Sequence, residues 1–597
     1  MRNPIPALPL VRAAVLAALL PLAACGDRGG GGDRPAGAAA AADTGGTPET
    51  GGTAVLAELS DINRPLPLLA ESSLDGDLGG DVMFNSLSRG VWRDGGLVYV
   101  NATENPTALA RAWEFLPPDS SALRYHLASG RRWSDGRPIT AADVVFTYKL
   151  VKDASVASPQ QDHANHIDSV VAENDSTVTF YFDRRYPEML FHSGLGIAPA
   201  HVFEGVAPGQ IRTHRAFTDP ARHLVVSGPF KIGEWAKGTQ VTLVPNPHFP
   251  VKPRLERIVI RIIPEATTRL TELMTGNIDF MRPIPFDQVP HVRQQAPNVR
   301  FEVEEKRFYD YIGYNPRTFA PFGDPEIRRA LGMAIDVKGL IGALQMEGHA
   351  VPAGAPYSPI FRDLYDPRTM PPLTYDTAGA IRILEAKGWR DTDGDGVRDR
   401  NGQPFRFTFE TNSGNARRAD VTQIVQQQWK RIGVDARIQM SETNTFFDRL
   451  TKKQFQASAG GWSVGLSPDL TTLWGPESPF NFVSYNDPQT TALFEQALRQ
   501  PTAELAQPIW RQAAGRIAQA QPYTFLYFMD QLDGVNNRLR GMKIDTYGAY
   551  QNTWEWWIPR RLQRAVQSAP RPAPADTGAA ARTDTGAAAG TDSAKGR

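Results

Sequence analysis

Residues 133–146 read WSDGRPITAADVVF, and they come shortly after the segment LRYHL at 123–127. We interpret LRYHL as a strand, and the Ser-Asp-Gly triplet predicts a turn after it. Thr140 and Asp143 have the spacing of a capping box, in which the two side chains accept hydrogen bonds from N–H groups at the start of a helix. The stretch therefore predicts a strand, a turn and a capped helix in succession.

The same two kinds of element alternate along the rest of the body. Alternating polar and apolar residues predict strands, while capping signals and apolar residues at helical spacing predict helices. We expect strands at 177–182, 240–244, 258–262 and 434–438, a helix from Pro325 behind the N-cap Asp324, and another over 421–432. This alternation is typical of the α/β class with mixed sheets.

Composition excludes several classes of protein. The 597 residues contain 64 Lys and Arg and 64 Asp and Glu. The basic surface typical of a nucleic-acid-binding protein is therefore not expected, and we expect no nucleic-acid partner. The only cysteine, Cys25, excludes an intrachain disulfide framework and a cysteine-rich zinc module. After the first 25 residues, no stretch has the length of apolar sequence that an internal membrane span needs.

The N-terminus has the order of a secretory signal. Arg2 and Arg12 precede the apolar run AAVLAALLPLAA at 13–24, which is too short to remain as a membrane anchor. Cys25 follows directly, and small residues before a cysteine resemble a bacterial lipobox, in which the cysteine becomes lipidated. This resemblance implies a protein held through lipid on Cys25 at a membrane of the cell envelope, on the periplasmic side. The alternative is a plain signal peptide with an incidental cysteine.

Five strings in the body of the chain are more specific than this general pattern. They are the segment 123–146 quoted above, SGPFKI with EW and NP at 227–247, IPEAT with GNID at 263–279, IGYN with PEIRRAL and AID at 312–336, and PYTFLY at 522–527. In this order they resemble the signature of the family 5 extracellular solute-binding proteins, the oligopeptide- and dipeptide-binding components of ABC importers. The resemblance covers nearly all of residues 56–565.

The resemblance implies a periplasmic-binding-protein-like α/β fold. Two lobes with mixed sheets would surround a cleft, an additional domain would extend lobe I, and crossing strands would form the hinge. The expected layout is a lipoprotein signal peptide at 1–25, a flexible tether at 26–55, lobe I at 56–105, 222–308 and 530–565, the additional domain at 106–221, lobe II at 309–529, and a disordered tail at 566–597.

The resemblance also implies a function. The protein would capture a peptide or peptide-like solute by closure of the hinge and deliver it to the permease subunits of an importer. Such a protein is not an enzyme, requires no cofactor and is expected to be a monomer. The alternatives are an oligosaccharide- or metal-chelate-binding protein of the same importer class, an exported enzyme that reuses the fold, and a chaperone-like or sensory protein.

One departure from the family bears on the solute. The family's peptide binders carry a G-W-x-x-D-Y string, whose tryptophan lines the cleft and whose aspartate pairs with the free amino group of the peptide. This chain has GWSVGL at 461–466, with Trp462 in place but Gly465 at the aspartate position. Asp469 can substitute only if the loop is rearranged, which puts capture by the α-amino group in doubt. The candidate ligand-binding residues are Trp462, Trp474, Asp469, Tyr309, Tyr311 and Asn85.

A second motif concerns a metal. Residues 391–399 read DTDGDGVRD, which has the spacing of a calcium loop. The ligands of a structural calcium would be the carboxylates of Asp391, Asp393, Asp395 and Asp399 and the carbonyl of Val397. The last loop position, where an EF-hand has a bidentate glutamate, is glycine, so the affinity would be weak. The alternative is an acidic surface turn.

Overall fold

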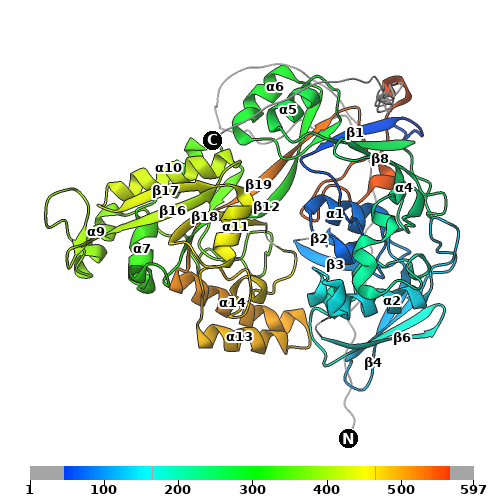
Figure 1. Ribbon diagram of the computed structural model, residues 1–597, viewed down its shortest axis with the longest axis horizontal. Coiled ribbons are helices and arrows are strands. Elements are labelled where there is room, and N and C mark those ends of the chain that lie inside the picture. The colour runs from blue at the N-terminus through cyan, green and yellow to red at the C-terminus, as the bar shows by residue number, and fades with distance from the viewer. Residues whose placement is uncertain (1–45, 94, 165, 464, 565–597) are drawn as a thin grey trace, which may run out of the picture. The chain divides into compact units, whose positions relative to one another are not determined.

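Two long antiparallel strands, β12 (Val299–Tyr314) and β19 (Tyr523–Asn536), lie in the middle of an 11-stranded sheet. The computed structural model describes residues 46–93, 95–164, 166–463 and 465–564 (Figure 1). The predicted signal peptide with Cys25, the tether as far as residue 45 and the predicted tail at 566–597 lie outside these residues.

The sheet extends into two arms from this central pair. The first arm follows β19 and contains β11 (Phe280–Met281), β1 (Thr53–Glu58), β10 (Arg257–Ile262), β9 (Gln240–Pro245) and β8 (Phe230–Ala236). The second follows β12 and contains β18 (Ala457–Ser463), β16 (Arg406–Asn412) and β17 (Asp435–Ser441), while β13 (Ala350–Pro352) pairs with β19. Both arms mix parallel and antiparallel pairs, which confirms the predicted mixed α/β fold. We call the part around the first arm lobe I and the part around the second arm lobe II.

A separate sheet forms the additional domain. Its four strands lie in the order β4 (Ala110–Leu116), β5 (Ala122–Leu127), β7 (Thr177–Phe182) and β6 (Ile167–Asn174), and α2 (Ala141–Lys152) packs on β6 and β7. We call this part the additional domain. The remaining strands of the described residues form two hairpins, β2 (Arg89–Arg93) with β3 (Gly96–Val100) and β14 (Asp399–Arg400) with β15 (Gln403–Pro404).

Helices accompany each part of the fold (Figure 1). Those of lobe I and the additional domain, besides α2, are α1 (Ser73–Asp77), α3 (Met189–His192), α4 (Pro220–His223), α5 (Ala266–Met274) and α6 (Val289–Gln295). Those of lobe II are α7 (Pro325–Met333), α8 (Val337–Ala343), α9 (Thr377–Ala386), α10 (Ala416–Lys430), α11 (Thr443–Thr451), α12 (Thr471–Trp474), α13 (Pro488–Leu498) and α14 (Ala503–Ala520). Across the described ranges, none of the helices is both long and apolar enough to cross a membrane.

Several local predictions are confirmed and two are corrected. Thr140 and Asp143 form the predicted capping box at the start of α2, and β7 has the predicted bounds. Helix α10 begins at Ala416, before the predicted 421, because the Asn415 side chain caps a polar first turn that carries no apolar periodicity. The predicted tether ended at residue 55, but β1 begins at Thr53 because it pairs in parallel with β10.

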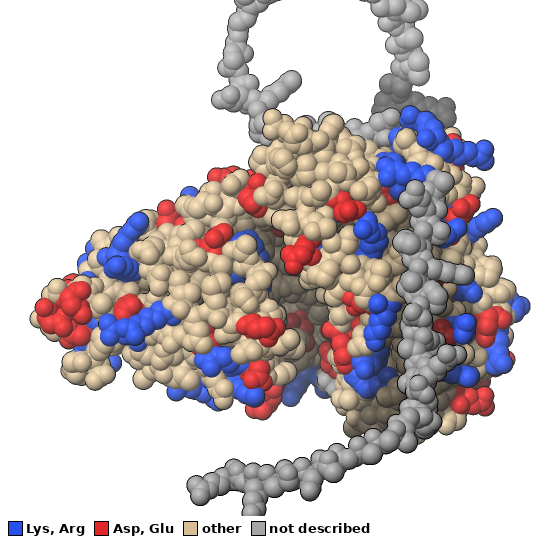
Figure 2. Space-filling model, turned by 45° about the horizontal axis from the view of Figure 1, so that its top comes forward, with Lys and Arg blue, Asp and Glu red and all other residues tan. Residues whose placement is uncertain are grey.

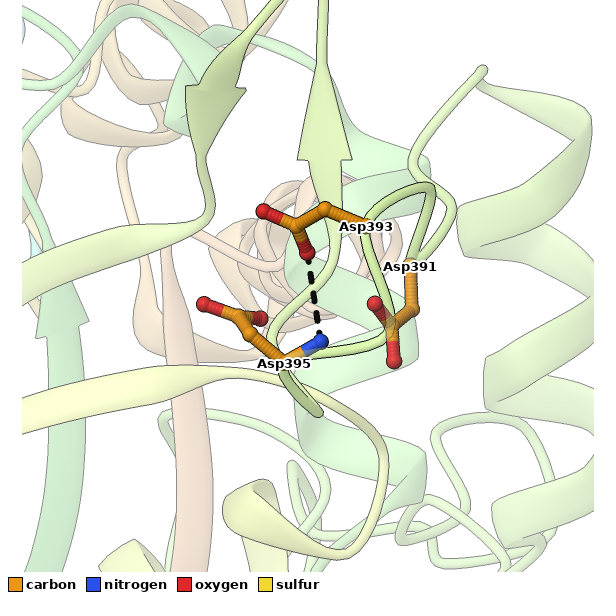
Figure 3. A group of neighbouring side chains, drawn as sticks. All are labelled: Asp391, Asp393 and Asp395. Carbon is orange, nitrogen blue, oxygen red and sulfur yellow. Dashed lines mark hydrogen bonds between the residues drawn. The ribbon is translucent and has the colours of Figure 1, made fainter.

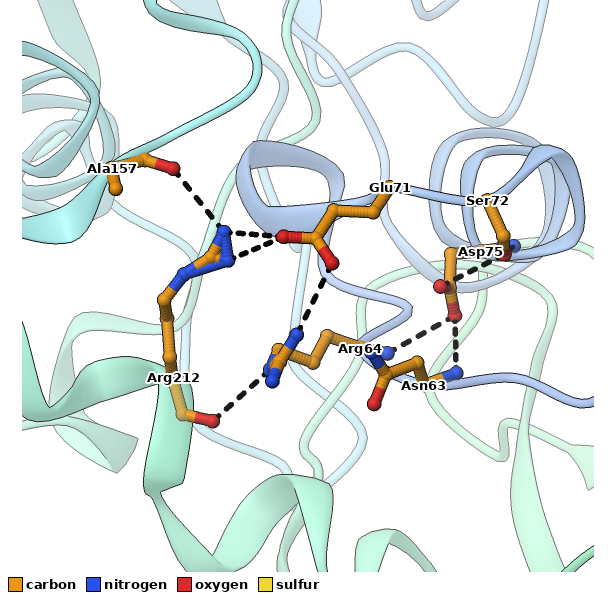
Figure 4. A network of polar contacts seen from close by, with 7 residues as sticks. All are labelled: Asn63, Arg64, Glu71, Ser72, Asp75, Ala157 and Arg212. Carbon is orange, nitrogen blue, oxygen red and sulfur yellow. Dashed lines mark hydrogen bonds and ion pairs between the residues drawn. The ribbon is translucent and has the colours of Figure 1, made fainter. Parts of the chain in front are cut away.

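A polar network fastens the additional domain to lobe I (Figure 4). Glu71 accepts hydrogen bonds from Arg212 at 2.5 and 2.6 Å, and Arg212 also donates to the Ala157 carbonyl at 3.2 Å. Arg64 donates to the Arg212 carbonyl at 3.2 Å. The hydrophobic core is also continuous between the two parts, because one cluster of buried side chains includes strand residues of both. We conclude that the additional domain moves with lobe I.

The crossing strands change register where the lobes join. Glu304 lies opposite Gln531, but Phe308 lies opposite Met529, so the first strand carries a bulge between these pairs. Lys306, within the bulge, has a φ of +44°, in the left-handed region. The bulge bends the ribbon that connects lobe I to lobe II, and it is the natural site of a hinge.

Candidate functional site

A cavity of about 370 Å³ is lined by lobe I, the additional domain and lobe II together. Its wall includes Asp77, Arg89 and Tyr547 of lobe I, His163 of the additional domain, Leu466 of lobe II and Arg307 of β12. The surface is hollowed along a furrow, with acidic and basic side chains on both of its sides (Figure 2). A cavity of this size, formed by segments far apart in the sequence, suits a small solute.

The charged groups on the lobe I side of the cavity are already paired. Arg89 forms an ion pair with Asp81, and its guanidinium lies 4.8 Å from the ring centre of Tyr547. Burial raises the pKa of Asp81, although Arg89 opposes this shift. Asp77 is paired in the same way with Arg282. A solute in the cavity therefore meets fixed dipoles and paired charges on this side.

Arg307 connects the hinge to lobe I. It donates hydrogen bonds to the carbonyls of Thr546 at 2.9 Å and Tyr547 at 3.3 Å. Its neighbour Phe308 lines a different cavity, of about 580 Å³, which also includes Phe286 and Arg417. Only the first of these two is also lined by the additional domain and by the loop after Trp462.

Trp462 lies on β18, opposite Tyr309 of β12, and is half-buried. Its ring stacks on Phe482 at 5.5 Å between centroids and is perpendicular to Phe480 at 5.8 Å. Leu466, four residues further along, reaches the cavity wall. The structure thus places the tryptophan beside the loop that lines the cavity, and its contact with solute stays a prediction.

The other aromatic candidates are part of the interior of lobe II. Trp474 is 1% exposed and packs on Tyr523 at 4.6 Å between centroids. Tyr309 and Tyr311 are 1% and 2% exposed, and Tyr311 stacks on Tyr523 at 3.8 Å. Their side chains stabilise the core in this structure, and any direct contact with solute stays a prediction.

Asn85 lies in lobe I and is 2% exposed. Its side chain donates to the Ser227 carbonyl at 3.1 Å, and its backbone N–H donates to the Ser227 hydroxyl at 2.8 Å. The following Ser86 and Ser88 line the cavity instead. Asn85 therefore holds in place the segment just before β2, from which its neighbours reach the cavity.

The acidic loop of lobe II forms a turn (Figure 3). The carboxylates of Asp391, Asp393 and Asp395 offer oxygens that all lie within 4.8 Å of one another. Asp391 accepts hydrogen bonds from the N–H groups of Gly394 and Gly396, and Asp399 accepts two from Thr392. The three carboxylates have the spacing that a calcium ion needs. The backbone bonds also suit a turn without an ion, so calcium binding by this loop stays a prediction.

Comparisons with known proteins identify the family of this chain. The family model described as bacterial extracellular solute-binding proteins, family 5 Middle, matches residues 106–482, more than half of the chain. The chain belongs to this family. A curated relative of this family 5 protein, oligopeptide-binding protein AppA of Bacillus subtilis (strain 168), is 27% identical over 444 residues, which are 73% of this chain and 80% of the relative.

Two solved structures share the fold. The structure of AppA from Bacillus subtilis in complex with a nonapeptide has a TM-score of 0.73 at 24% identity and covers 86% of this chain and 100% of that one. NikZ from Campylobacter jejuni in complex with Ni(L-His) has a TM-score of 0.70 at 22% identity and covers 85% and 99%. The family and these neighbours are solute-binding proteins and not enzymes.

Most of the cavity wall of this family 5 protein was missed by sequence reasoning. Arg89, His163, Arg307 and Tyr547 lie in four separate segments, and no spacing in the sequence relates them. The string after Trp462 was a usable signal, because Leu466 lies within it. A cavity wall formed by long-range packing leaves no local periodicity to read.

Proposed function

We propose that this protein captures a peptide or peptide-like solute in the cavity between its lobes and releases it to the permease of an ABC importer. The observation that carries the proposal is the cavity itself, which is lined from both sides of the crossing-strand hinge. A solute there contacts lobe I, the additional domain and lobe II only when the hinge brings them together. Binding then favours the closed form by its differential affinity.

Family membership supports a solute-binding role, and the relatives that are oligopeptide-binding proteins support a peptide. The paired charges of both signs, Arg89 with Asp81 and Arg282 with Asp77, suit a polar solute. Delivery to a permease is part of the proposal, and so is anchoring through lipid on Cys25, with the periplasmic side of a membrane as the location. A monomer is sufficient for this mechanism.

An oligosaccharide or a metal chelate is the second candidate. Gly465 favours it, because a peptide's ammonium group would lack the carboxylate that the family's peptide binders place there. Gly465 is exposed, and the space around it is open. The same cleft would serve either class of solute.

Native mass spectrometry of the full chain, purified from a bacterial host, tests the proposal. The intact mass is compared with the mass after denaturation, and any labile mass is fragmented. Peptide fragments support the proposal, and a hexose series or a metal chelate supports the second candidate. If no mass is bound, a thermal-shift screen follows, in which a ligand at 100 times its Kd adds about 2.7 kcal/mol. No shift with peptides, sugars or chelates would contradict the solute-capture proposal.

A further inference from the structure

Helix α1 and the π-helical segment Leu78–Met83 that follows it run along the lobe I side of the cavity. Gly76 and Gly80 both line the cavity, and so do the residues that follow each of them, Asp77 and Asp81. Positions four residues apart lie on the same face of a helix. Two neighbouring positions on the cavity side of this helical segment therefore carry no side chain.

Packing does not account for these two glycines. A Cβ atom at Gly76 or Gly80 would meet no heavy atom within 4 Å beyond its own helix backbone and chain neighbours. Neither residue has a φ in the left-handed region, so a residue with a Cβ atom could adopt the same backbone conformation. Glycine in a helix is less stable than alanine. The two positions therefore leave open space at some expense of helix stability.

The other glycines of the cavity wall differ in this respect. A Cβ atom on Gly196 would lie 2.7 Å from the Pro67 side chain, and Cβ atoms on Gly90 and Gly194 would each lie 3.0 Å from a neighbouring atom. These three positions are glycine because neighbouring parts of the fold already occupy the space. At the two positions of the helical segment, by contrast, the space is part of the cavity.

Two unpartnered polar atoms point to a solute in the same cavity. Ser88 lines it and is 1% exposed, and its hydroxyl has no hydrogen-bond partner among the described atoms. The nearby Tyr125 hydroxyl is bonded to Ser193 instead, at 2.7 Å. The Nδ1 atom of His163, in the additional domain, is buried and likewise has no partner among these atoms. Buried polar groups are normally satisfied by protein, water or ligand, so both atoms favour a solute with polar groups.

Polar contacts hold the helical segment in place beside the cavity. Arg89 donates a hydrogen bond of 3.0 Å to the Gly80 carbonyl and forms an ion pair with Asp81. Asp77 is paired with Arg282. The carboxylates next to the two glycines are thus neutralised within lobe I, and the helix backbone between them is fixed before any solute arrives.

We propose that the face of this segment formed by Gly76 and Gly80 is the floor of the solute site, on which the captured solute lies in van der Waals contact with the helix backbone. The inference rests on the proposed solute-binding function and names residues that set the shape of the solute. A helix face without side chains allows close approach to the backbone. It therefore accepts an extended, unbranched part of a solute, and the two glycines determine specificity through the space that they leave.

Alanine substitution separates this role from a role in folding. Gly76→Ala and Gly80→Ala, the floor variants, each add one methyl group in open space. Because alanine favours a helix over glycine, the urea midpoint of unfolding should stay the same or rise. The methyl group takes the place of solute atoms, so the affinity should fall about 10-fold or more. A lower affinity together with a lower urea midpoint would mean that the positions are packed, and would overturn the proposal.

Gly515→Ala is the matched control. Gly515 lies inside α14 of lobe II, where a Cβ atom would also meet no heavy atom within 4 Å, and its φ is also outside the left-handed region. It lines a different cavity. The control should keep or raise the urea midpoint in the same way, with no change in solute affinity. If it weakens solute binding as much as the floor variants do, the effect is not specific to the floor and the proposal fails.

Calorimetry measures the affinities with two probes, trialanine for a peptide solute and maltotriose for the second candidate. The floor variants should weaken whichever probe the wild-type protein binds. If that probe is maltotriose alone, peptide capture fails for this probe while weaker binding by the floor variants still supports the floor. Equal affinity of the wild-type protein and the floor variants overturns the floor and leaves solute capture intact.

A ligand-free measurement decides if the wild-type protein binds neither probe. Gly80→Cys places a thiol on the floor, and iodoacetamide should alkylate it in the folded protein at a rate within about 10-fold of the rate in urea. Mass spectrometry of the peptide that contains position 80 reads this reaction separately from that of Cys25. Alkylation at this rate supports an open floor even without an identified solute. A slower reaction shows that the position is closed off by packing, and overturns the proposal.

Discussion

Lys306 on β12 and Asp530 on β19 form an ion pair of 2.7 Å at the point where the register of the two crossing strands breaks. The same carboxylate accepts the backbone N–H of Lys306 at 3.0 Å and hydrogen-bonds to His349 at 3.1 Å. The left-handed conformation of Lys306 is unfavourable for a residue with a Cβ atom. Asp530 therefore stabilises the bend of the hinge, because it binds both the backbone N–H and the ammonium group of Lys306.

We predict that Asp530→Asn lowers the free energy of unfolding by about 1–3 kcal/mol, because the side chain is only 6% exposed and Lys306 loses its counter-charge. Equilibrium urea unfolding measures the change. Asp448→Asn removes an exposed ion pair of 2.8 Å with Lys452 and should cost less than about 0.5 kcal/mol. Equal effects of the two substitutions would contradict a structural role for the hinge pair.

The same site predicts a pH dependence. Burial works to raise the pKa of Asp530, but hydrogen bonds and the charge of Lys306 outweigh it and hold the pKa below 3.8. A depressed carboxyl pKa stabilises the fold above its unfolded value, and this contribution is lost as the pH falls through the folded value. The stability difference between wild type and Asp530→Asn should therefore shrink on acidification below about pH 4. A difference that stays constant would refute this.

Breaking a buried ion pair of the first arm should lower the free energy of unfolding more than breaking the hinge pair does. Arg538 contacts both oxygens of Asp279, at 2.5 and 2.6 Å, and Asp279 also accepts the N–H of Val55 at 2.8 Å. Asp279→Asn leaves the Arg538 charge buried and should cost about 3–5 kcal/mol. Arg222 and Asp219 form an exposed pair, and Asp219→Asn is the control, with an expected loss of less than about 1 kcal/mol in the same urea titration. If Asp279→Asn lowers the free energy of unfolding only slightly, Arg538 is not held mainly through Asp279.

These residues show which parts of the molecule the sequence could predict. The capping box of Thr140 and Asp143 and the strand Thr177–Phe182 depend on neighbours in the chain, so local patterns identify them. The fold followed from five such local strings in a known order. Asp279 lies in one of them, and its partner Arg538 lies 259 residues away.

The site was less predictable because it depends on packing. Trp462 and Trp474 look alike in the sequence, yet one is half-buried beside the cavity loop and the other is 1% exposed in the core. Burial and contacts between distant segments decide such roles, and a single sequence does not contain them in readable form.

Calcium binding by the acidic loop of residues 391–399 can be measured directly. We predict that calcium binds with a Kd of roughly 10⁻⁴ to 10⁻³ M. Three carboxylates lie close enough to bind one ion, but the last loop position is a glycine, where an EF-hand has a bidentate glutamate. Calorimetric titration of the full chain measures it. The double variant Asp393→Asn with Asp395→Asn should abolish the heat of binding while solute binding is retained. If the wild-type protein shows no heat of calcium binding, the loop is an acidic turn held by its own backbone hydrogen bonds.

An aromatic contact also joins the two lobes. Trp92 of β2 in lobe I meets Phe361 of lobe II edge to face, with 6.4 Å between ring centroids. The turn of the same hairpin lies close to lobe II as well, since a Cβ atom on Gly95 would be 2.5 Å from Arg362. The hairpin also lines the cavity through Arg89, so the cavity wall and the contact between the lobes share one element.

Trp92→Ala removes a contact that exists only when the lobes meet, and an aromatic pair adds about 0.5–1.5 kcal/mol beyond its buried area. We therefore expect a larger radius of gyration for the bound protein and solute affinity about 2- to 10-fold weaker, with little change in unfolding free energy. Trp113 makes a similar contact with Tyr125, 6.1 Å between centroids, entirely inside the additional domain. Trp113→Ala should do the reverse, lowering stability while leaving the hinge equilibrium unchanged. If both variants lose stability alike and neither changes the scattering, the Trp92 contact is ordinary packing and closure depends on other groups.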